Sequence, residues 1–158
     1  MKRFYVFLHL RPLLLVMVFP WLLHCFDHAG LPAALRWFNG LGLLLLMGGL
    51  LVLLPAHWQL YKPSQWTTQG SPFDEPNTLV TGGAYRYIRH PQLLGIYLSL
   101  FGEALLLQSW LIAAYALLIL ITSARVALGY ESVRLREAFG DRYADYAAST
   151  KRFVPGVF

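Results

Sequence analysis

A run of apolar residues and glycines extends without interruption from Leu41 to Leu54. A helix of about 20 mainly apolar residues is what crosses the hydrocarbon core of a bilayer. The chain has 158 residues, of which 57% are hydrophobic and only 13% are charged, and its mean hydropathy is +0.49. The sequence therefore predicts a single all-α integral-membrane domain over residues 1–158, with about four transmembrane helices at residues 4–26, 35–61, 91–108 and 110–128.

The N-terminus resembles a secretion signal, because Lys2 and Arg3 precede an apolar run. Arg11 and Pro12 interrupt that run, and no small-residue cleavage site follows it, so we expect it to remain as the first span. The single cysteine, Cys25, excludes an internal disulfide and a multi-cysteine metal site. No metal site is expected from the scattered histidines His9, His24 and His28.

The basic residues are distributed unequally between the two sides of the predicted spans. Lys and Arg concentrate on the cytoplasmic side of membrane proteins. With four spans, twelve of the 13 basic residues fall on one side and only Arg36 falls on the other. This predicts an integral membrane protein with both termini in the cytoplasm, and the short chain favours a bacterial inner membrane. The net charge of +5 then reflects topology and contact with anionic lipids of the bilayer, so no nucleic-acid partner is expected.

Two segments are predicted to lie in the cytoplasm. Residues 62–90 are rich in proline and glycine, which predicts a loop without a long helix. Residues 130–149 are predicted to form a C-terminal amphipathic interfacial helix, with Gly140 ending its first part and Asp141 capping a further short helix. This segment either lies on the membrane or folds back over the mouth of the bundle. A tight antiparallel hairpin is predicted where only Gln108 and Ser109 separate the last two spans.

The segment before the third span reads Gly83-Ala84-Tyr85-Arg86-Tyr87-Ile88-Arg89-His90-Pro91. Proline suits the first position of a helix, where its missing N–H costs nothing, so a helix is predicted to begin at Pro91. Three basic side chains then lie at a helix N-terminus, where free N–H groups and the helix dipole attract anions. The segment either holds a negatively charged ligand at the membrane surface or merely keeps this end of the protein in the cytoplasm.

The strongest candidate carboxylate is Glu131, just beyond the fourth span. Because the last two spans form a hairpin, Glu131 would lie level with Arg89 and His90 and share a pocket with them. The alternative is a surface glutamate that favours the helix dipole or pairs with Arg134 or Arg136.

Other residues carry weaker signals. Glu103 lies inside the third span, where a carboxylate is costly, and it either lines a polar path or faces a neighbouring helix. His57 and Trp58 near the inner end of the second span either approach the same pocket or anchor that end in the interface. The pair Gly40 and Gly42 is explained by helix packing.

The motif Leu79–Gly95 resembles the signature of integral-membrane isoprenylcysteine carboxyl methyltransferases and phospholipid N-methyltransferases. The second half of their pattern is matched further along the chain, by Glu131, Leu135, Phe139-Gly140, Tyr143 and Tyr146, and ends near Phe153-Val154-Pro155. The resemblance covers about residues 60–155. Two positions depart from the family pattern: Leu93 replaces a tyrosine found in many members, and Ser132 replaces a second glutamate.

The resemblance implies transfer of a methyl group from S-adenosylmethionine to a lipophilic or small amphiphilic acceptor at the cytoplasmic interface. The acceptor would be a carboxylate, a thiol or an amine. Catalytic roles are implied for Glu131 and for Arg134, and either Arg134 or Arg136 would orient an anionic acceptor. Cofactor binding is implied for Tyr85, Tyr87, Arg89, His90, Pro91, Leu94, Gly95 and Glu131.

Two alternatives to an enzyme remain open at this point. Leu93 and Ser132 favour a non-catalytic lipid- or partner-binding membrane protein that retains the methyltransferase fold. Glu103 alone prompts a third reading, a small transporter or channel subunit, but the chain has no internal repeat that supports it.

Overall fold

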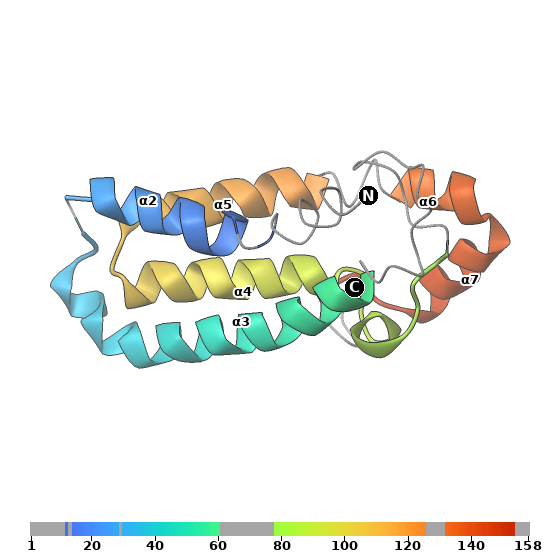
Figure 1. The fold of residues 1–158 in the computed structure, drawn as a ribbon, viewed down its shortest axis with the longest axis horizontal. Coiled ribbons are helices and arrows are strands. Elements are labelled where there is room, and N and C mark those ends of the chain that lie inside the picture. Colours follow the sequence, from blue (N-terminus) through green and yellow to red (C-terminus); the bar gives the residue numbers. More distant parts are fainter. Residues whose placement is uncertain (1–11, 13, 29, 61–77, 126–131, 154–158) are drawn as a thin grey trace, which may run out of the picture.

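The computed structural model describes residues 12, 14–28, 30–60, 78–125 and 132–153, and every regular element among them is a helix. The long helices run side by side along one axis, and the last two helices gather beyond one end of them (Figure 1). The predicted all-α class is therefore confirmed. The elements are η1 (Leu14–Val18, a π-helical turn), α2 (Phe19–Phe26), η2 (Ala33–Phe38), α3 (Asn39–Leu60), η4 (Gly83–Arg86), α4 (Pro91–Leu106), α5 (Trp110–Arg125), α6 (Ser132–Phe139) and α7 (Asp141–Ser149).

Each of the four predicted spans contains an apolar helix, but the helices differ in length. The helical segment Leu35–Leu60 has 26 residues and a mean hydropathy of 2.1, which is enough to cross a bilayer. The described apolar helices Leu14–Phe26, Pro91–Leu106 and Trp110–Arg125 are shorter. A helix of 16 residues is about 24 Å long, slightly less than the hydrocarbon core. The number of spans therefore stays a prediction.

Helices α3 and α4 form the most extensive contact between any two elements. Glycines spaced seven residues apart on each helix, Gly42 and Gly49 on α3 and Gly95 and Gly102 on α4, let the two backbones touch. A Cβ atom built on Gly95 would lie 2.7 Å from the nitrogen of Leu53 and 2.8 Å from the carbonyl oxygen of Gly49. Small residues permit this close approach in membrane helices, where lipid offers no hydrophobic drive for association.

The packing explanation of the pair Gly40 and Gly42 is therefore correct for one residue only. A Cβ on Gly42 would lie 2.9 Å from the carbonyl oxygen of Gly102, whereas a Cβ on Gly40 would meet nothing within 4 Å. The hydrophobic core lies beside this contact, where α3 and α4 meet η1 and α5. Its most deeply buried members are Val16, Leu53, Ile96, Leu100 and Ala116.

The predicted tight turn between the last two spans is confirmed. Helix α4 ends at Leu106, α5 begins at Trp110, and Gln108 between them takes a left-handed backbone conformation with φ 52°. The Gln108 side chain donates a 2.7 Å hydrogen bond to Oδ1 of Asn39, the first residue of α3. The carboxylate of Asp27 accepts hydrogen bonds from the Ser109 hydroxyl and from the N–H of Leu111 at 3.1 Å. These bonds tie the hairpin to the segments before it.

The predicted C-terminal helical segment over residues 130–149 consists of two helices, α6 and α7. Gly140 separates them with φ 54°, a conformation that glycine adopts without the strain of a Cβ. The predicted break at Gly140 is thus correct. Asp141 is not the cap, because it is already the first residue of α7 and Gly140 holds the cap position without a side-chain hydrogen bond. Residues 130 and 131 lie outside the described residues.

The predicted loop over residues 62–90 is described only from Thr78 onward. In that part the chain forms one short 3₁₀ turn, η4, between Gly82 and the start of α4. The expectation of a segment without a long helix is confirmed for residues 78–90. Residues 61–77 lie outside the described residues.

Candidate functional site

The start of α4 has the form that the sequence predicts. Pro91 is its first residue and is buried, and His90 holds the cap position. The N–H groups of the first turn have no partner inside a helix, and proline has none to satisfy. We call His90 and the first turn of α4 the entrance of α4. This entrance therefore offers backbone N–H donors beside a histidine.

The C-terminal residues 150–153, which we call the strap, run along the residues that precede α4. Thr150 ends α7 and is buried, and the strap then pairs with Ile88 and Arg89 in a single parallel bridge. The N–H of Arg89 donates to the carbonyl oxygen of Lys151 at 2.7 Å, and the N–H of His90 donates to that of Arg152 at 3.1 Å. The segment after α7 is thus folded back over the residues that precede α4, and the placement of α6 and α7 on the membrane stays a prediction.

His90 is enclosed by the strap and is only 8% exposed. The ring of Phe153 lies 5.5 Å from the imidazole, tilted by 36°. Burial, together with the positive charges of Arg89 and Arg152, lowers the pKa of His90 from 6.5 to about 4. The imidazole is therefore neutral near pH 7 and carries no charge there.

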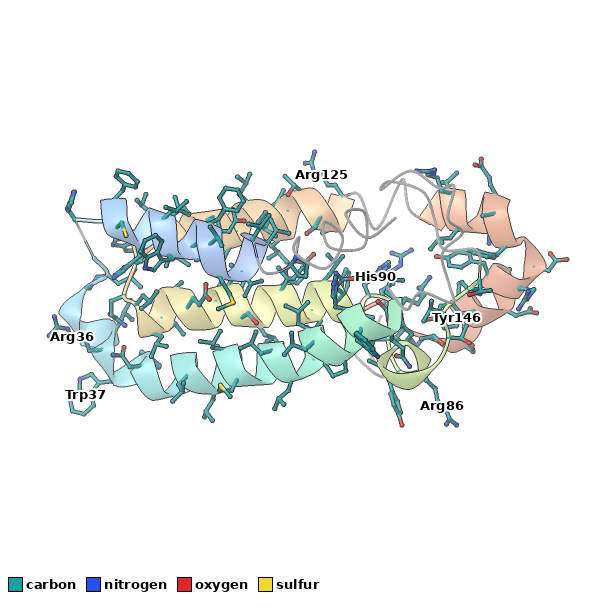
Figure 2. The ribbon with its side chains drawn as sticks, viewed as in Figure 1. Arg36, Trp37, Arg86, His90, Arg125 and Tyr146 are labelled. Carbon is teal, nitrogen blue, oxygen red and sulfur yellow. The ribbon has the colours of Figure 1, made fainter. Side chains whose placement is uncertain are left out.

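The expectation of three cations around the start of α4 is corrected accordingly. His90 is uncharged, and Arg86 is exposed on the outer side of the η4 turn, away from His90 (Figure 2). Two guanidinium groups act on the imidazole, those of Arg89 and Arg152. The sequence pattern did not single out Arg152, because it lies more than fifty positions beyond the end of the motif.

Arg89 is also close to a group of tyrosines on η4 and α7. The Tyr146 hydroxyl donates a 2.7 Å hydrogen bond to the carbonyl oxygen of Tyr85. Burial raises the pKa of Tyr146 to about 12, with the charge of Arg89 acting in the opposite direction and Tyr143 adding to the rise. The rings of Tyr143 and Tyr146 are 6.5 Å apart.

Two buried polar atoms in this group have no hydrogen-bond partner among the described residues. They are Nε of Arg89 and the hydroxyl oxygen of Tyr143, whose side chain is only 4% exposed. Buried donors without partners are costly, and they are found where a ligand or water completes the site. One is a guanidinium and the other a hydroxyl, and each is a donor that suits an anionic oxygen.

Helix α3 reaches the same end of the bundle. His57 is buried, and its Nδ1 lies 3.1 Å from Nε2 of Gln92 in the first turn of α4. His57 therefore lies beside the first turn of α4, and its role in a shared pocket stays a prediction, whereas the neighbouring Trp58 is 61% exposed and faces outward. Gln92 was missed, because a glutamine in the first turn of an apolar helix carries no distinctive signal.

The remaining predicted cofactor residues are placed in different surroundings. Tyr85 is buried, but Tyr87 two residues later is 65% exposed. Leu94 is half-buried in the first turn of α4. Gly95 faces the backbone of α3, so the structure gives it a packing role. Leu93, which departs from the family pattern, packs against the hydrophobic core.

The two predicted catalytic residues belong to the segment around the start of α6. Glu131 lies outside the described residues, so its convergence with His90 stays a prediction. Arg134 is half-buried on α6, and α6 lies at the end of the molecule where α4 begins (Figure 1). The side chain of Ser132 is not described.

The arrangement defines a class of protein, a helical membrane bundle that is closed at one end. The closed end is where α4 begins after His90, and it is covered by α6, α7 and the strap, which together we call the cap. Residues 37–142 match the phospholipid methyltransferase family, and the chain belongs to this family of integral-membrane methyltransferases. The match covers the α3–α4 pair, the α4 entrance and the start of the cap. The resemblance seen in the sequence motifs is therefore confirmed.

Two known proteins illustrate the relationship. The chain is 31% identical over 85 residues to protein-S-isoprenylcysteine O-methyltransferase A of Arabidopsis thaliana, an alignment that covers 54% of this chain and 43% of the plant protein. The solved structure of the eukaryotic intramembrane Ras methyltransferase, isoprenylcysteine carboxyl methyltransferase, is similar in fold, with a TM-score of 0.60 and 23% identity. That similarity covers 90% of this chain and 51% of the other. The chain thus spans about half the length of these relatives.

Proposed function

We propose that the protein transfers a methyl group from S-adenosylmethionine to a lipophilic or small amphiphilic acceptor at the cytoplasmic membrane interface. The observation that carries the proposal is the closed entrance of α4. There, a neutral histidine lies at one end of an apolar bundle with the guanidinium groups of Arg89 and Arg152 and the unpartnered Tyr143 hydroxyl. Membership of a membrane methyltransferase family supports the same reaction class.

The residues at this entrance suit the cofactor by their charge and their hydrogen-bond donors. The cofactor's amino-acid carboxylate suits the unpartnered Nε of Arg89, the Tyr143 hydroxyl and the free N–H groups of the first turn of α4. Neutral His90 adds one more donor. An aromatic face attracts the sulfonium cation, and of the two neighbouring tyrosines the buried Tyr85 suits this role better than the exposed Tyr87. When bound, S-adenosylmethionine supplies an electrophilic methyl group.

The chain's own contribution is positioning and the exclusion of water. Methyl transfer is an in-line displacement, so holding the acceptor in line accounts for much of the rate. The strap and the mainly apolar first turn of α4 exclude water from the site. A carboxylate acceptor needs no general base, whereas a thiol or amine must first lose a proton.

We assign the remaining roles to the α6 segment. Glu131 accepts hydrogen bonds from the cofactor's amine or ribose, and Arg134 orients an anionic acceptor. The acceptor enters from the lipid bilayer, which is the protein's main partner.

We also propose that all four apolar segments span the membrane, with both termini in the cytoplasm of a bacterial cell. Arg86 and His90 lie at one end of the bundle, and Arg36 and Trp37 lie at the opposite end (Figure 2). This separation agrees with a cytoplasmic α4 entrance. The exposed large apolar side chains of α3, among them Leu44 and Leu51, suit contact with lipid.

The test is equilibrium binding of S-adenosylmethionine to the detergent-purified protein, followed by transfer of labelled methyl into membrane extracts. We expect His90→Ala and Glu131→Ala each to weaken binding by about tenfold or more, the effect of losing a hydrogen bond to a charged group. The exposed residues His24 and Glu137 provide matched controls, and His24→Ala and Glu137→Ala should bind like the wild type. Absence of saturable binding, or equal binding by all variants, contradicts the proposal.

A second candidate function is a non-catalytic lipid- or partner-binding protein that retains this fold. It is favoured by the packing of Leu93 into the core, where many family members carry a tyrosine. Cofactor binding without any labelled product would support this function over methyl transfer.

A further inference from the structure

We propose that Phe153 is a positioning residue for His90, and that the strap formed by residues 150–153 is one wall of the cofactor site. This inference rests on the proposed function, because it assigns a role within that same site. The strap follows the last helix of the chain and reaches the motif from more than sixty positions away.

The first step of the argument is the backbone pairing. The N–H groups of Arg89 and His90 both donate to the strap, to the carbonyl oxygens of Lys151 and Arg152. These two bonds fix the path of the chain immediately before Pro91, in residues that belong to no helix. The direction of the imidazole therefore depends on a segment that is not part of the α4 motif.

The second step is the ring contact. Phe153 lies between two aromatic rings of the α4 region, 5.5 Å from His90 and 6.2 Å from Tyr97, with tilts of 36° and 45°. Ring pairs at such distances attract each other beyond their burial. The hydroxyl of Tyr97 is in turn 2.7 Å from the Ser123 hydroxyl on α5. Phe153 thus connects the imidazole through Tyr97 to the cytoplasmic end of α5.

The third step is the chemistry that the contact serves. A neutral imidazole has one N–H and one acceptor nitrogen, so its usefulness to a ligand depends on the rotation of its ring. The packing of Phe153 against one face of His90 restricts that rotation. Arg152, next to Phe153 on the strap, brings a positive charge close to the imidazole and disfavours its protonation. The strap thereby supplies both the orientation and part of the electrostatic environment of His90.

The experiment compares two phenylalanines that contact the same core. Phe153→Leu removes the ring that contacts His90. Phe101→Leu removes a half-buried ring from α4, eleven positions after His90. Each variant is purified in detergent and measured for thermal midpoint, for S-adenosylmethionine affinity, and for the side-chain resonances of ¹⁵N,¹³C-labelled histidine. The His90 signal is assigned from its absence in His90→Gln.

We expect Phe153→Leu to shift and broaden the His90 signal and to weaken cofactor binding about three- to tenfold. Phe153→Tyr, which keeps the ring, should restore both readouts. Phe101→Leu should lower the thermal midpoint but leave the His90 signal and the affinity of the folded protein unchanged. If Phe153→Leu does not fold, Phe153→Met gives the same comparison with a flexible side chain of similar volume.

The inference is overturned if the His90 signal in Phe153→Leu matches the wild type, or if Phe101→Leu changes it equally. The histidine signal needs no cofactor, so it tests the positioning role even if the wild type fails to bind S-adenosylmethionine. That failure would contradict the proposed function alone. A shifted His90 signal with unchanged affinity would overturn the assignment of the strap as a wall of the site.

Discussion

The hydroxyl of Tyr146 on α7 donates a 2.7 Å hydrogen bond to the backbone carbonyl of Tyr85, a residue 61 positions earlier in the chain. The bond joins the last helix to the turn that precedes α4. Because the Tyr85 side chain is also buried, the cap and the motif form one packed unit. A substitution that disrupts the cap should therefore also disturb the motif, and a substitution in the motif should disturb the cap.

We expect Tyr146→Phe to lower the free energy of unfolding by about 1 kcal/mol, since it leaves the Tyr85 carbonyl without this donor. Tyr143→Phe is the matched control on the same helix. It removes a buried hydroxyl that has no partner among the described residues, so without ligand it should be neutral or slightly stabilising. The measurement is equilibrium unfolding in mixed micelles. Equal losses in the two variants would contradict the assigned bond.

The stability of the protein should also depend on pH through His90. Its pKa is lowered from 6.5 to about 4, so between these values the unfolded chain binds a proton that the folded protein does not. The contribution is fully present above pH 6.5 and is lost as the pH falls toward 4, by at most about 3 kcal/mol. Between pH 7 and pH 4.5, the free energy of unfolding of His90→Gln should therefore decrease less than that of the wild type. His24→Gln, at an exposed position, should keep the wild-type slope.

Local features of this fold were predictable because single residues determine them. Pro91 begins α4 because proline has no N–H to satisfy. Gly140 ends α6 because its left-handed conformation suits a residue without a Cβ. The turn at Gln108 followed from the length of the apolar segments on each side.

The site was predictable only in part, because its decisive contacts join segments that are distant in the sequence. Nothing in the order of residues places Phe153 against His90, since the strap has no helical or strand periodicity. The lowered pKa of His90 depends on burial, on Arg89 and on Arg152, and the last of these lies on the distant strap. Tyr85 and Tyr87 look equivalent in the sequence, but the η4 turn buries the first and exposes the second.

The close contact between α3 and α4 gives a prediction independent of the site. A Cβ on Gly102 would lie 2.7 Å from the carbonyl oxygen of Gly42 and 2.5 Å from the nitrogen of Leu46, backbone atoms that cannot move aside. We expect Gly102→Ala to destabilise the protein by about 2 kcal/mol or more. Gly48→Ala is the control, because a Cβ there meets nothing within 4 Å. It should be neutral or stabilise the helix by up to about 1 kcal/mol. Similar thermal midpoints for the two variants would contradict the close backbone contact between α3 and α4.

The far end of the bundle allows stability to be separated from ligand binding. Asp27 accepts hydrogen bonds from the Ser109 hydroxyl, from the N–H of Leu111 at 3.1 Å and from the N–H of Gly30 at 3.3 Å. A carboxylate at the start of α5 also favours the helix dipole. We expect Asp27→Ala to cost about 2 kcal/mol of unfolding free energy, because several donors lose their acceptor at once.

The affinity of folded Asp27→Ala for S-adenosylmethionine should nevertheless equal that of the wild type. Asp27 lies where α4 ends, and the proposed site lies where α4 begins, about 24 Å away along a helix of 16 residues. Asp145→Ala, an exposed carboxylate on α7, is the control for the loss of a negative charge, and it should leave stability nearly unchanged. Binding titrations are made below the thermal midpoint of each variant, so that only folded protein is compared. A tenfold loss of affinity in Asp27→Ala would mean that the two ends of the bundle are coupled and that the site is not confined to the entrance of α4.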